Sequence, residues 1–443
     1  MEIMFCRYQM LKSTVEAYQE VHVPLILKAG TQYSPSGFGD DIGIYLFIPW
    51  LSRFWNVPLE KAIDLFFYSM IGVGFFLSLV CFGFLFKDLI FKDKTLSETL
   101  LAVFAAFAIP WAVLWGGLSI NRGSVLFFSL MAGMGWLLGS GRFPALSRAL
   151  LLKVLAGSGL FYMAAFAAHY GDVYVTEMFC SASVVPLFLV WQKKGRRLNL
   201  FFWTIMAFSG LVVGFCDLIH SQGGTAALLF VLAFVGLSEG LKWRQKLPAF
   251  LVLLFFMAAP YALLKSAEIQ RDGFLAAQIR DYRPDTKSHP IWHSIYIGLG
   301  FIPNKYNIQY LDQSGMAAAQ TVDPKVTLYS DEYNHILRGK IFQILKMDFG
   351  FVVEVVLAKA VRLMLLVGVF ANIGIFLCWK LRFSMKGLTP FVLAGLFYAL
   401  PGLLVIPTQR YVLGLISLSI IFCVYLAGTW LEKVSARKMG TVL

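Results

Sequence analysis

Apolar segments long enough to cross a lipid bilayer recur along this chain, and they limit the folds that it can adopt. A spanning helix needs about 17 to 25 apolar residues, and within lipid only helices and closed barrels satisfy every backbone polar group. Such windows lie at residues 66–86, 97–116, 122–139, 150–168, 174–192, 199–219, 225–240, 247–265, 363–379, 387–407 and 411–430. Of the 443 residues, 58% are hydrophobic and 14% are charged, which is typical of a polytopic membrane protein. We therefore expect an all-α polytopic membrane protein with about 11 or 12 transmembrane helices, external amphipathic helices and a small external subdomain.

The formal net charge of +13 is distributed in a way that favours membrane topology over nucleic-acid binding. Basic residues gather in short clusters between apolar windows, at 87–94, 142–153, 193–197, 242–246, 380–386 and 433–438. These clusters fall on alternate loops, so the positive-inside rule puts all of them in the cytoplasm. We expect an integral protein of a bacterial inner membrane, with its active site facing the periplasm and with no nucleic-acid partner.

This topology divides the chain into four parts. They are an external loop with an acidic motif and amphipathic helices (1–65), a transmembrane helix bundle (66–265), an external subdomain or lid (266–350), and an interfacial helix followed by C-terminal transmembrane helices (351–443). Residues 1–30 are too polar to form a span or a signal peptide. An external N-terminus therefore requires either a further apolar helix upstream or a short tail that the following helix translocates.

Two adjacent acids, Asp40 and Asp41, stand in the stretch SGFGDDIGIYLFIPW, just before an apolar run. Neighbouring carboxylates repel, so such a pair near a membrane needs water, a cation or a hydrogen-bond donor to satisfy it. The turn-rich residues before the pair and the amphipathic run after it are typical of an external membrane surface. A carboxylate there can take the proton of an acceptor hydroxyl as that hydroxyl attacks an activated sugar carbon. We predict that Asp40 and Asp41 are the catalytic acids, one of them serving as the base.

Three cations on the same side of the membrane are candidates to bind the phosphate of a sugar donor. Arg410 stands between two strongly apolar segments, and its guanidinium can bind phosphate through two hydrogen bonds. Lys359 and Arg362 lie on the run FGFVVEVVLAKAVRLMLLVG, which we expect to form an amphipathic helix along the outer interface. The alternative for all three is that the long side chains only reach the lipid headgroups.

The long external segment 266–350 combines aromatic and polar side chains in the stretch SHPIWHSIYIGLGFIPNKYNIQYLD. Flat aromatic rings suit sugar faces, and polar groups suit sugar hydroxyls. We therefore expect a substrate-binding surface that includes His289, Trp292, His293, Asn304 and Tyr306. The alternative is an interfacial helix anchored by its aromatic residues.

Two further acids lie at the outer ends of predicted helices, namely Asp172 and Asp217. Either is a second acid of the site or a hydrated loop residue, and we count Asp172 among the substrate-binding candidates. His289 and His293 have the spacing of a zinc pair, but the proline between them is expected to start the helix and leave His289 at its cap. We therefore predict no metal site and no cofactor, and leave open a divalent cation at the two adjacent aspartates.

With these residues in place, the sequence resembles the GT-C class of membrane glycosyltransferases, such as the aminoarabinose and mannosyl transferases. The resemblance rests on G-D-D-I-G-I-Y in the first external loop, the amphipathic segment after it, the many spans, and Arg410-Tyr411 at the start of the last span. It implies that an acid of that loop is the base and that Arg410 contacts the donor phosphate. It also implies a polyprenyl-phosphate-linked sugar as donor, a lipid or glycan as acceptor, and contact with membrane lipids.

Two other functions remain open from the sequence. A transporter or flippase for lipid-linked glycans would carry charges along a path through the membrane, whereas the charges here crowd one face. A polysaccharide polymerase or ligase would depend instead on His289, His293 and Arg338 in the large external segment.

Overall fold

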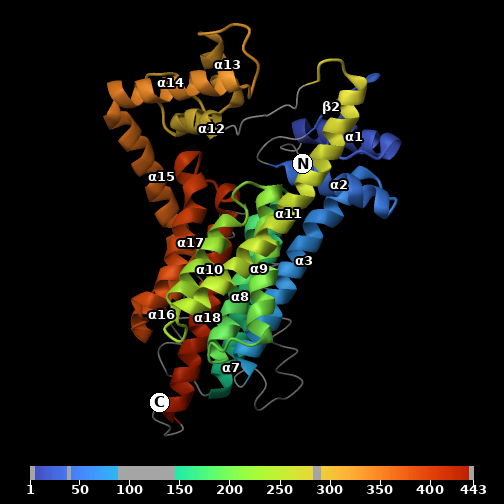
Figure 1. The fold of residues 1–443 in the computed structure, drawn as a ribbon. Helices are drawn as coiled ribbons and strands as arrows, with labels where there is room; N and C mark the ends of the chain where they lie inside the picture. The colour runs from blue at the N-terminus through green and yellow to red at the C-terminus, as the bar shows by residue number, and fades with distance from the viewer. Residues whose placement is uncertain (1–4, 37–40, 88–144, 283–290, 439–443) are drawn as a thin grey trace.

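The computed structural model describes residues 5–36, 41–87, 145–282 and 291–438. Within these ranges the chain is almost wholly helical (Figure 1). The exception is one antiparallel hairpin of β1 (Ile26–Ala29) and β2 (Gln32–Pro35), in which Leu27 pairs with Ser34.

Six of the described helical segments are long and apolar enough to cross a membrane. They are α3 (Leu59–Leu85), α8 (Val175–Lys193), α9 (Leu200–Ile219), α11 (Trp243–Gln278), α17 (Met385–Leu404) and the segment Arg410–Val434, which comprises the short helix η3 (Arg410–Val412) and most of α18 (Leu413–Lys438). A seventh span is formed if α15 (Phe349–Phe370) and α16 (Asn372–Leu381) count as one, although they are bent by 71°. The chain is thus built as an α-helical membrane protein, as its sequence predicts.

Several of the predicted windows differ from the helices observed. Window 225–240 contains α10 (Thr225–Gly236), whose 12 residues are too few to cross a core that needs about 20. Residues 351–362 belong to the single long helix α15, so no separate interfacial helix precedes the next span. Window 150–168 lies inside α7 (Ala145–Tyr170), and windows 97–116 and 122–139 lie outside the described residues.

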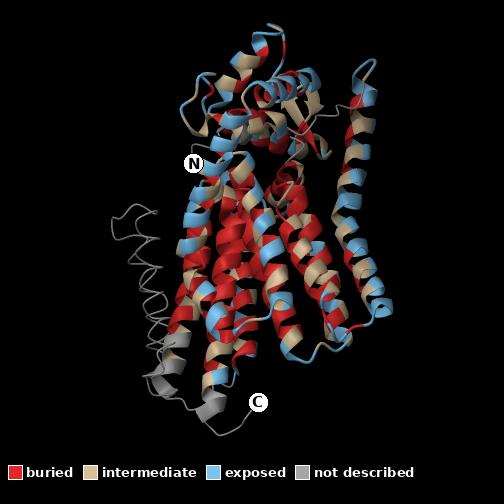
Figure 2. Ribbon diagram, turned by 90° about the vertical axis from the view of Figure 1, so that its left-hand side faces the viewer, coloured by how far each residue is buried: buried red, intermediate tan, exposed pale blue. Residues whose placement is uncertain are grey.

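The centre of the bundle is formed by α8 and α18, which are buried along almost their whole length (Figure 2). Large aromatic side chains fill the space around α8, where Trp191 packs 4.8 Å from Phe202 between ring centroids. In contrast, α11 is mostly exposed although it is strongly apolar. Exposed apolar surface of this extent is expected of a helix that faces lipid.

Close packing of α9 against α11 depends on two glycines spaced four residues apart. A Cβ at Gly210 would lie 2.3 Å from the carbonyl oxygen of Leu253, and one at Gly214 would lie 2.3 Å from that of Met257. Small residues at this spacing let two helix backbones approach, which is a main source of helix association within lipid.

The N-terminal segment gathers at one end of the bundle, beside the end of α11 (Figure 1). It comprises α1 (Phe5–Val21), the hairpin and α2 (Ile42–Phe54). With 36 residues, α11 is about 54 Å long, so it extends past the hydrocarbon and packs Phe274 against Tyr33, at 5.4 Å between ring centroids. Residues 266–278 therefore continue α11 rather than open the external subdomain as expected.

A small subdomain at the same end has a hydrophobic core of its own. It contains α12 (Ile291–Gly298), the short helix η2 (Leu299–Phe301), α13 (Asp312–Gln320) and α14 (Asp331–Met347). Its core includes Ile297, Leu337 and Val355, the last contributed by α15. Because α15 runs from this core into the bundle, it joins the subdomain to the membrane part (Figure 1).

We predict that Gly214→Val destabilises the protein by about 1–3 kcal/mol, because the added side chain forces α9 and α11 apart. Thermal unfolding of the purified protein in detergent measures the effect. Gly72→Val is the matched control, because Gly72 is a helical glycine on α3 with no atom within 4 Å of an added Cβ. Equal losses of stability in the two variants would contradict this account of the α9–α11 packing.

Candidate functional site

A buried ion pair joins two distant parts of the chain at the end of the bundle that carries the subdomain. Arg410, in η3, forms a salt bridge with Asp172, in the turn before α8, and their side chains are only 12% and 7% exposed. Oδ1 of Asp172 accepts a hydrogen bond from the backbone N–H of Tyr174 at 3.0 Å, while Oδ2 faces Arg410. The structure thus brings together two of the residues that the sequence predicts for the site.

Aromatic side chains enclose this pair. The guanidinium carbon of Arg410 lies 5.1 Å from the ring centroid of Tyr174, a cation–π geometry. The Tyr174 ring also packs against His220 at 4.6 Å and Tyr411 at 4.9 Å. The Arg410 Nε atom is buried and has no hydrogen-bond partner among the described residues. A buried guanidinium with an unused donor can bind an anionic oxygen.

Glu177 adds a second buried acid beside the pair. Its Oε2 accepts a hydrogen bond from the backbone N–H of Gly414 at 2.9 Å, in the first turn of α18. Its Oε1 lies 3.9 Å from Nδ1 of His220, the residue that ends α9. An acid at a helix N-terminus satisfies a free N–H group and interacts favourably with the helix dipole. Glu177 therefore fixes the start of α18, and with it the position of Arg410.

Asp41 approaches this cluster from the N-terminal segment. It is fully buried at the N-terminus of α2. Two residues later, Gly43 packs so closely on the end of α9 that an added Cβ would lie 2.8 Å from the carbonyl of Leu218. Because Leu218 is two residues from His220, the start of α2 lies at the same end of α9 as the ion-pair cluster. The other predicted catalytic acid, Asp40, lies outside the described residues.

The two remaining phosphate-binding candidates differ in their surroundings. Lys359 is buried, and its Nζ donates to the carbonyl oxygen of Leu404 at 3.3 Å, at the end of α17. Residues 405–409 then lead directly to Arg410, so the Lys359 amine lies beside the segment that carries the guanidinium. Arg362, three residues further along α15, is exposed. The structure brings Lys359, but not Arg362, to the segment that leads to the cluster.

The predicted substrate-binding residues of the subdomain serve its internal structure. His293 is buried, with Nδ1 2.6 Å from the Tyr333 hydroxyl and Nε2 3.1 Å from Oδ1 of Asp312. The hydrogen bond with His293 lowers the pKa of Asp312, so the carboxylate is ionised and accepts a hydrogen bond from the Nε2–H group. Both ring nitrogens are thus engaged within the subdomain, while His289 lies outside the described residues.

Asn304 and Tyr306 likewise hold the loop between α12 and α13. The Asn304 side-chain NH₂ group donates to the carbonyls of Ile302 and Ile308. Its side-chain oxygen accepts from the backbone N–H groups of Tyr306 and Ile308. The Tyr306 hydroxyl donates to Asp348. Trp292 packs on the subdomain core. These contacts occupy the polar groups expected to face a sugar, because a loop that carries buried backbone must satisfy its own hydrogen bonds first.

One tyrosine connects the subdomain to the ion-pair cluster. The hydroxyl of Tyr310 donates to the hydroxyl of Tyr411 at 2.8 Å, and burial raises the pKa of Tyr310, so its proton stays in place. A second contact lies nearby. Gly298, at the end of α12, packs so closely on α17 that an added Cβ would lie 2.6 Å from the carbonyl oxygen of Leu404 and 2.7 Å from that of Val405. The subdomain is therefore docked onto the segment that precedes Arg410.

Sequence reasoning missed the roles of Glu177, His220 and Tyr174, since single polar residues near helix ends are most often hydrated or structural. Asp217, which the sequence left undecided, is such a case: its Oδ1 accepts hydrogen bonds from the backbone N–H groups of Gly224 and Thr225 and from the Thr225 hydroxyl.

Among the described residues there is no group of three or more His, Cys, Asp or Glu side chains placed to hold a metal ion. No protein-family model, curated protein or solved structure matches this chain.

We predict that Asp172→Ala lowers the free energy of unfolding by about 3–5 kcal/mol, because it leaves the Arg410 guanidinium buried without its counter-charge. The double variant Asp172→Leu, Arg410→Met should recover most of that loss, since it removes both charges. Unfolding in detergent measures both. The exposed pair of Lys193 and Glu432 provides the control, and Glu432→Ala should cost less than about 1 kcal/mol. A double variant no more stable than Asp172→Ala would show that the pairing is not what stabilises this end.

Proposed function

We propose that this protein is a GT-C type glycosyltransferase, which moves a sugar from a polyprenyl-phosphate donor to a hydroxyl of a lipid or glycan acceptor at the outer face of the membrane. The observation that carries the proposal is the convergence of a guanidinium and several carboxylates at one end of an apolar helix bundle. Arg410 pairs with Asp172, and Glu177 lies five residues after Asp172, in the first turn of α8. Transfer from a phosphate requires these two kinds of group close together, a cation for the leaving phosphate and an acid for the attacking hydroxyl.

Arg410 is the proposed ligand of the donor phosphate. Asp172 holds one side of its guanidinium and Tyr174 covers its face, so the group is oriented before a ligand arrives. Its Nε is buried and without a partner among the described residues, so it can donate to a phosphate oxygen once the ligand displaces the side chains that cover it. Lys359 supplies a second positive charge beside the segment that leads to Arg410.

Asp41 is the proposed base, with Asp40 as the adjacent acid of the same motif. The carboxylate takes the proton of the acceptor hydroxyl while that oxygen forms a bond to the anomeric carbon of the sugar. The bond between the anomeric carbon and the phosphate oxygen breaks, and its electron pair leaves with the polyprenyl phosphate. Arg410 stabilises the negative charge that develops on this oxygen. Attack from the face opposite the phosphate inverts the anomeric configuration.

The position of the subdomain also supports a transferase at this end of the bundle. Its contacts through Tyr310 and Gly298 fall on Tyr411 and on the end of α17, next to the proposed phosphate ligands. A cover of this kind excludes water, which would otherwise compete with the acceptor for the reactive donor.

We predict that Asp41→Asn reduces the rate of sugar transfer by about 10²- to 10⁴-fold, because the amide cannot accept the hydroxyl proton. The assay uses the purified protein in vesicles with a panel of polyprenyl-phosphate sugars and measures the release of polyprenyl phosphate. Asp40→Asn in the same assay identifies which acid of the motif is the base. Asp64→Asn, an exposed acid of α3, makes the same chemical change away from the site and should leave the rate unaltered. Full activity in an Asp40→Asn, Asp41→Asn double variant would refute the assignment.

We further predict that Arg410→Lys lowers transfer by about 10- to 100-fold, because lysine keeps the charge but loses the paired N–H donors. Because Arg410 binds the donor phosphate and also stabilises the charge that develops on the leaving oxygen, the loss should fall on kcat as well as on KM for the donor. Arg362→Lys makes the same exchange at an exposed position of α15 and should change neither constant. A larger effect at Arg362 than at Arg410 would place the donor elsewhere.

A further inference from the structure

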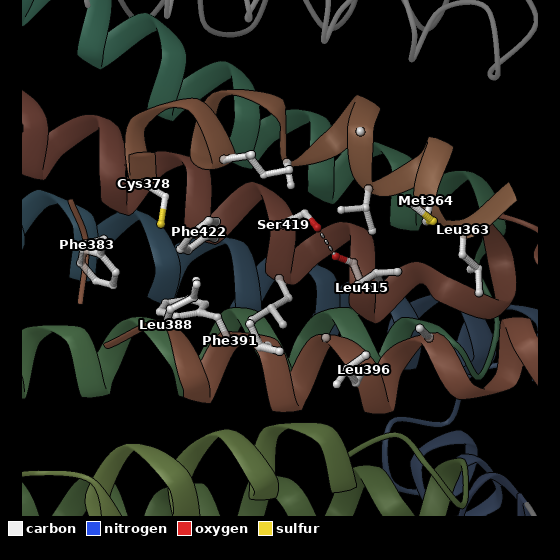
Figure 3. Close-up of a pocket in the computed structure, with 18 of the residues that line it drawn as sticks. Leu363, Met364, Cys378, Phe383, Leu388, Phe391, Leu396, Leu415, Ser419 and Phe422 are labelled. Carbon is white, nitrogen blue, oxygen red and sulfur yellow. Dashed lines mark hydrogen bonds between the residues drawn. The ribbon is translucent and has the colours of Figure 1, made fainter. Parts of the chain in front are cut away.

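A long apolar groove runs along the bundle between α15 and α16 on one side and α17 on the other, with α18 as its floor (Figure 3). Its volume is about 1190 Å³. Leu363 and Met364 lie at one end, and Cys378 and Phe383 lie at the other, where α16 turns into α17. The bend of 71° between α15 and α16 turns α16 away from the axis of α15 beside this space.

The middle of the groove offers almost only hydrocarbon. Leu388, Phe391 and Leu396 line it from α17, and Leu415 and Phe422 line it from α18 (Figure 3). The hydroxyl of Ser419 also faces it, but donates to the carbonyl of Leu415 at 2.7 Å. A surface of this kind cannot satisfy a polar ligand, so its shape and chemistry suit an extended apolar chain.

The end of the groove at the turn between α16 and α17 is positively charged. Lys380 and Arg382 belong to the lining, and neither forms an ion pair within the part of the chain that the structure describes. The Lys380 amine lies 4.9 Å from the ring centroid of Trp379, which is 71% exposed. Cations beside an exposed tryptophan are typical of the level of the lipid headgroups.

We propose that this groove binds an anionic membrane phospholipid, with its acyl chains along α17 and α18 and its phosphate at Lys380 and Arg382. The inference goes beyond the proposed transfer reaction and does not depend on it. Neither Lys359 nor Arg410 lines the groove. The charged end lies about 30 Å from the ion-pair cluster, the length of the 20-residue helix α17. A donor with its phosphate at Lys380 would place its sugar far from the proposed base, so a phospholipid fits the charge distribution better.

Binding of this lipid would stabilise the bent arrangement of α15 and α16. Its chains fill the space beside the bend, and the negative charge of its phosphate offsets the repulsion between the two cations at the α16–α17 turn.

The test measures lipid binding to the full-length protein in a neutral detergent after removal of copurified lipid. Phosphatidylglycerol and phosphatidylcholine with identical acyl chains are added separately, and binding is followed by native mass spectrometry and by the rise in unfolding temperature. We expect phosphatidylglycerol to bind more tightly and to raise the unfolding temperature more. Lys380→Ala with Arg382→Ala should weaken its binding roughly 30-fold, because each cation near an anionic lipid contributes about 1 kcal/mol.

Two further variants separate the groove from general surface charge. Arg197→Ala with Arg244→Ala removes two exposed cations that do not line the groove, and should leave lipid binding unaltered. Gly368→Trp adds bulk to the groove at a position where nothing lies within 4 Å of an added Cβ, so the new side chain should occupy the space of the acyl chains. The unfolding temperature without lipid reports that each variant is folded.

Three results would overturn the proposal. One is equal binding of phosphatidylglycerol and phosphatidylcholine. Another is unchanged phosphatidylglycerol binding in the Lys380→Ala, Arg382→Ala variant or in Gly368→Trp. The third is displacement of the phospholipid by polyprenyl phosphate at a stoichiometry of one, which would assign the groove to the donor. None of these results bears on whether Asp41 is needed for transfer, so the two proposals fail separately.

Discussion

The buried ion pair between Arg410 and Asp172 is the interaction on which this end of the molecule depends. It joins the start of the last helix to the turn before α8, more than two hundred residues earlier in the chain. Two charges leave water only when each finds the other and further hydrogen bonds. Tyr174 supplies one such bond through its N–H and covers the guanidinium with its ring. Glu177 supports the arrangement by holding the first turn of α18.

The ion pair lies close to the place where the two separately packed parts of the molecule meet. The bundle packs around α8 and α18, and the subdomain packs around a core of its own. The Tyr310–Tyr411 hydrogen bond and the contact of Gly298 with the end of α17 hold the subdomain against the bundle. Polar groups are thus gathered where helices end, because only there are backbone groups free and water close by. The opposite end, at the α16–α17 turn, carries positive charge and suits anionic headgroups.

Polar and apolar surfaces are therefore separated along the axis of the bundle. One end holds the acids and the guanidinium to which we assign the proposed transfer, and the middle offers hydrocarbon to lipid. Lys359 shows how strict this separation is, because its amine is buried and yet reaches a carbonyl at the C-terminal end of α17. A cation at that depth is retained only where a partner is available.

The sequence by itself determined the helical membrane class, since the apolar runs near Phe66, Leu200 and Met385 have the length of a spanning helix and not that of the shorter barrel strand. It also placed the acids and Arg410 at helix ends. Only the tertiary structure decided which of these side chains contact one another. Arg410 forms a salt bridge with Asp172, whereas His293 and Asn304 form hydrogen bonds within the subdomain. Helix lengths near α10 and α15 were likewise settled by packing. The reason is that hydropathy is a local property of the chain, whereas the pairing of polar groups depends on which helix ends the bundle brings together.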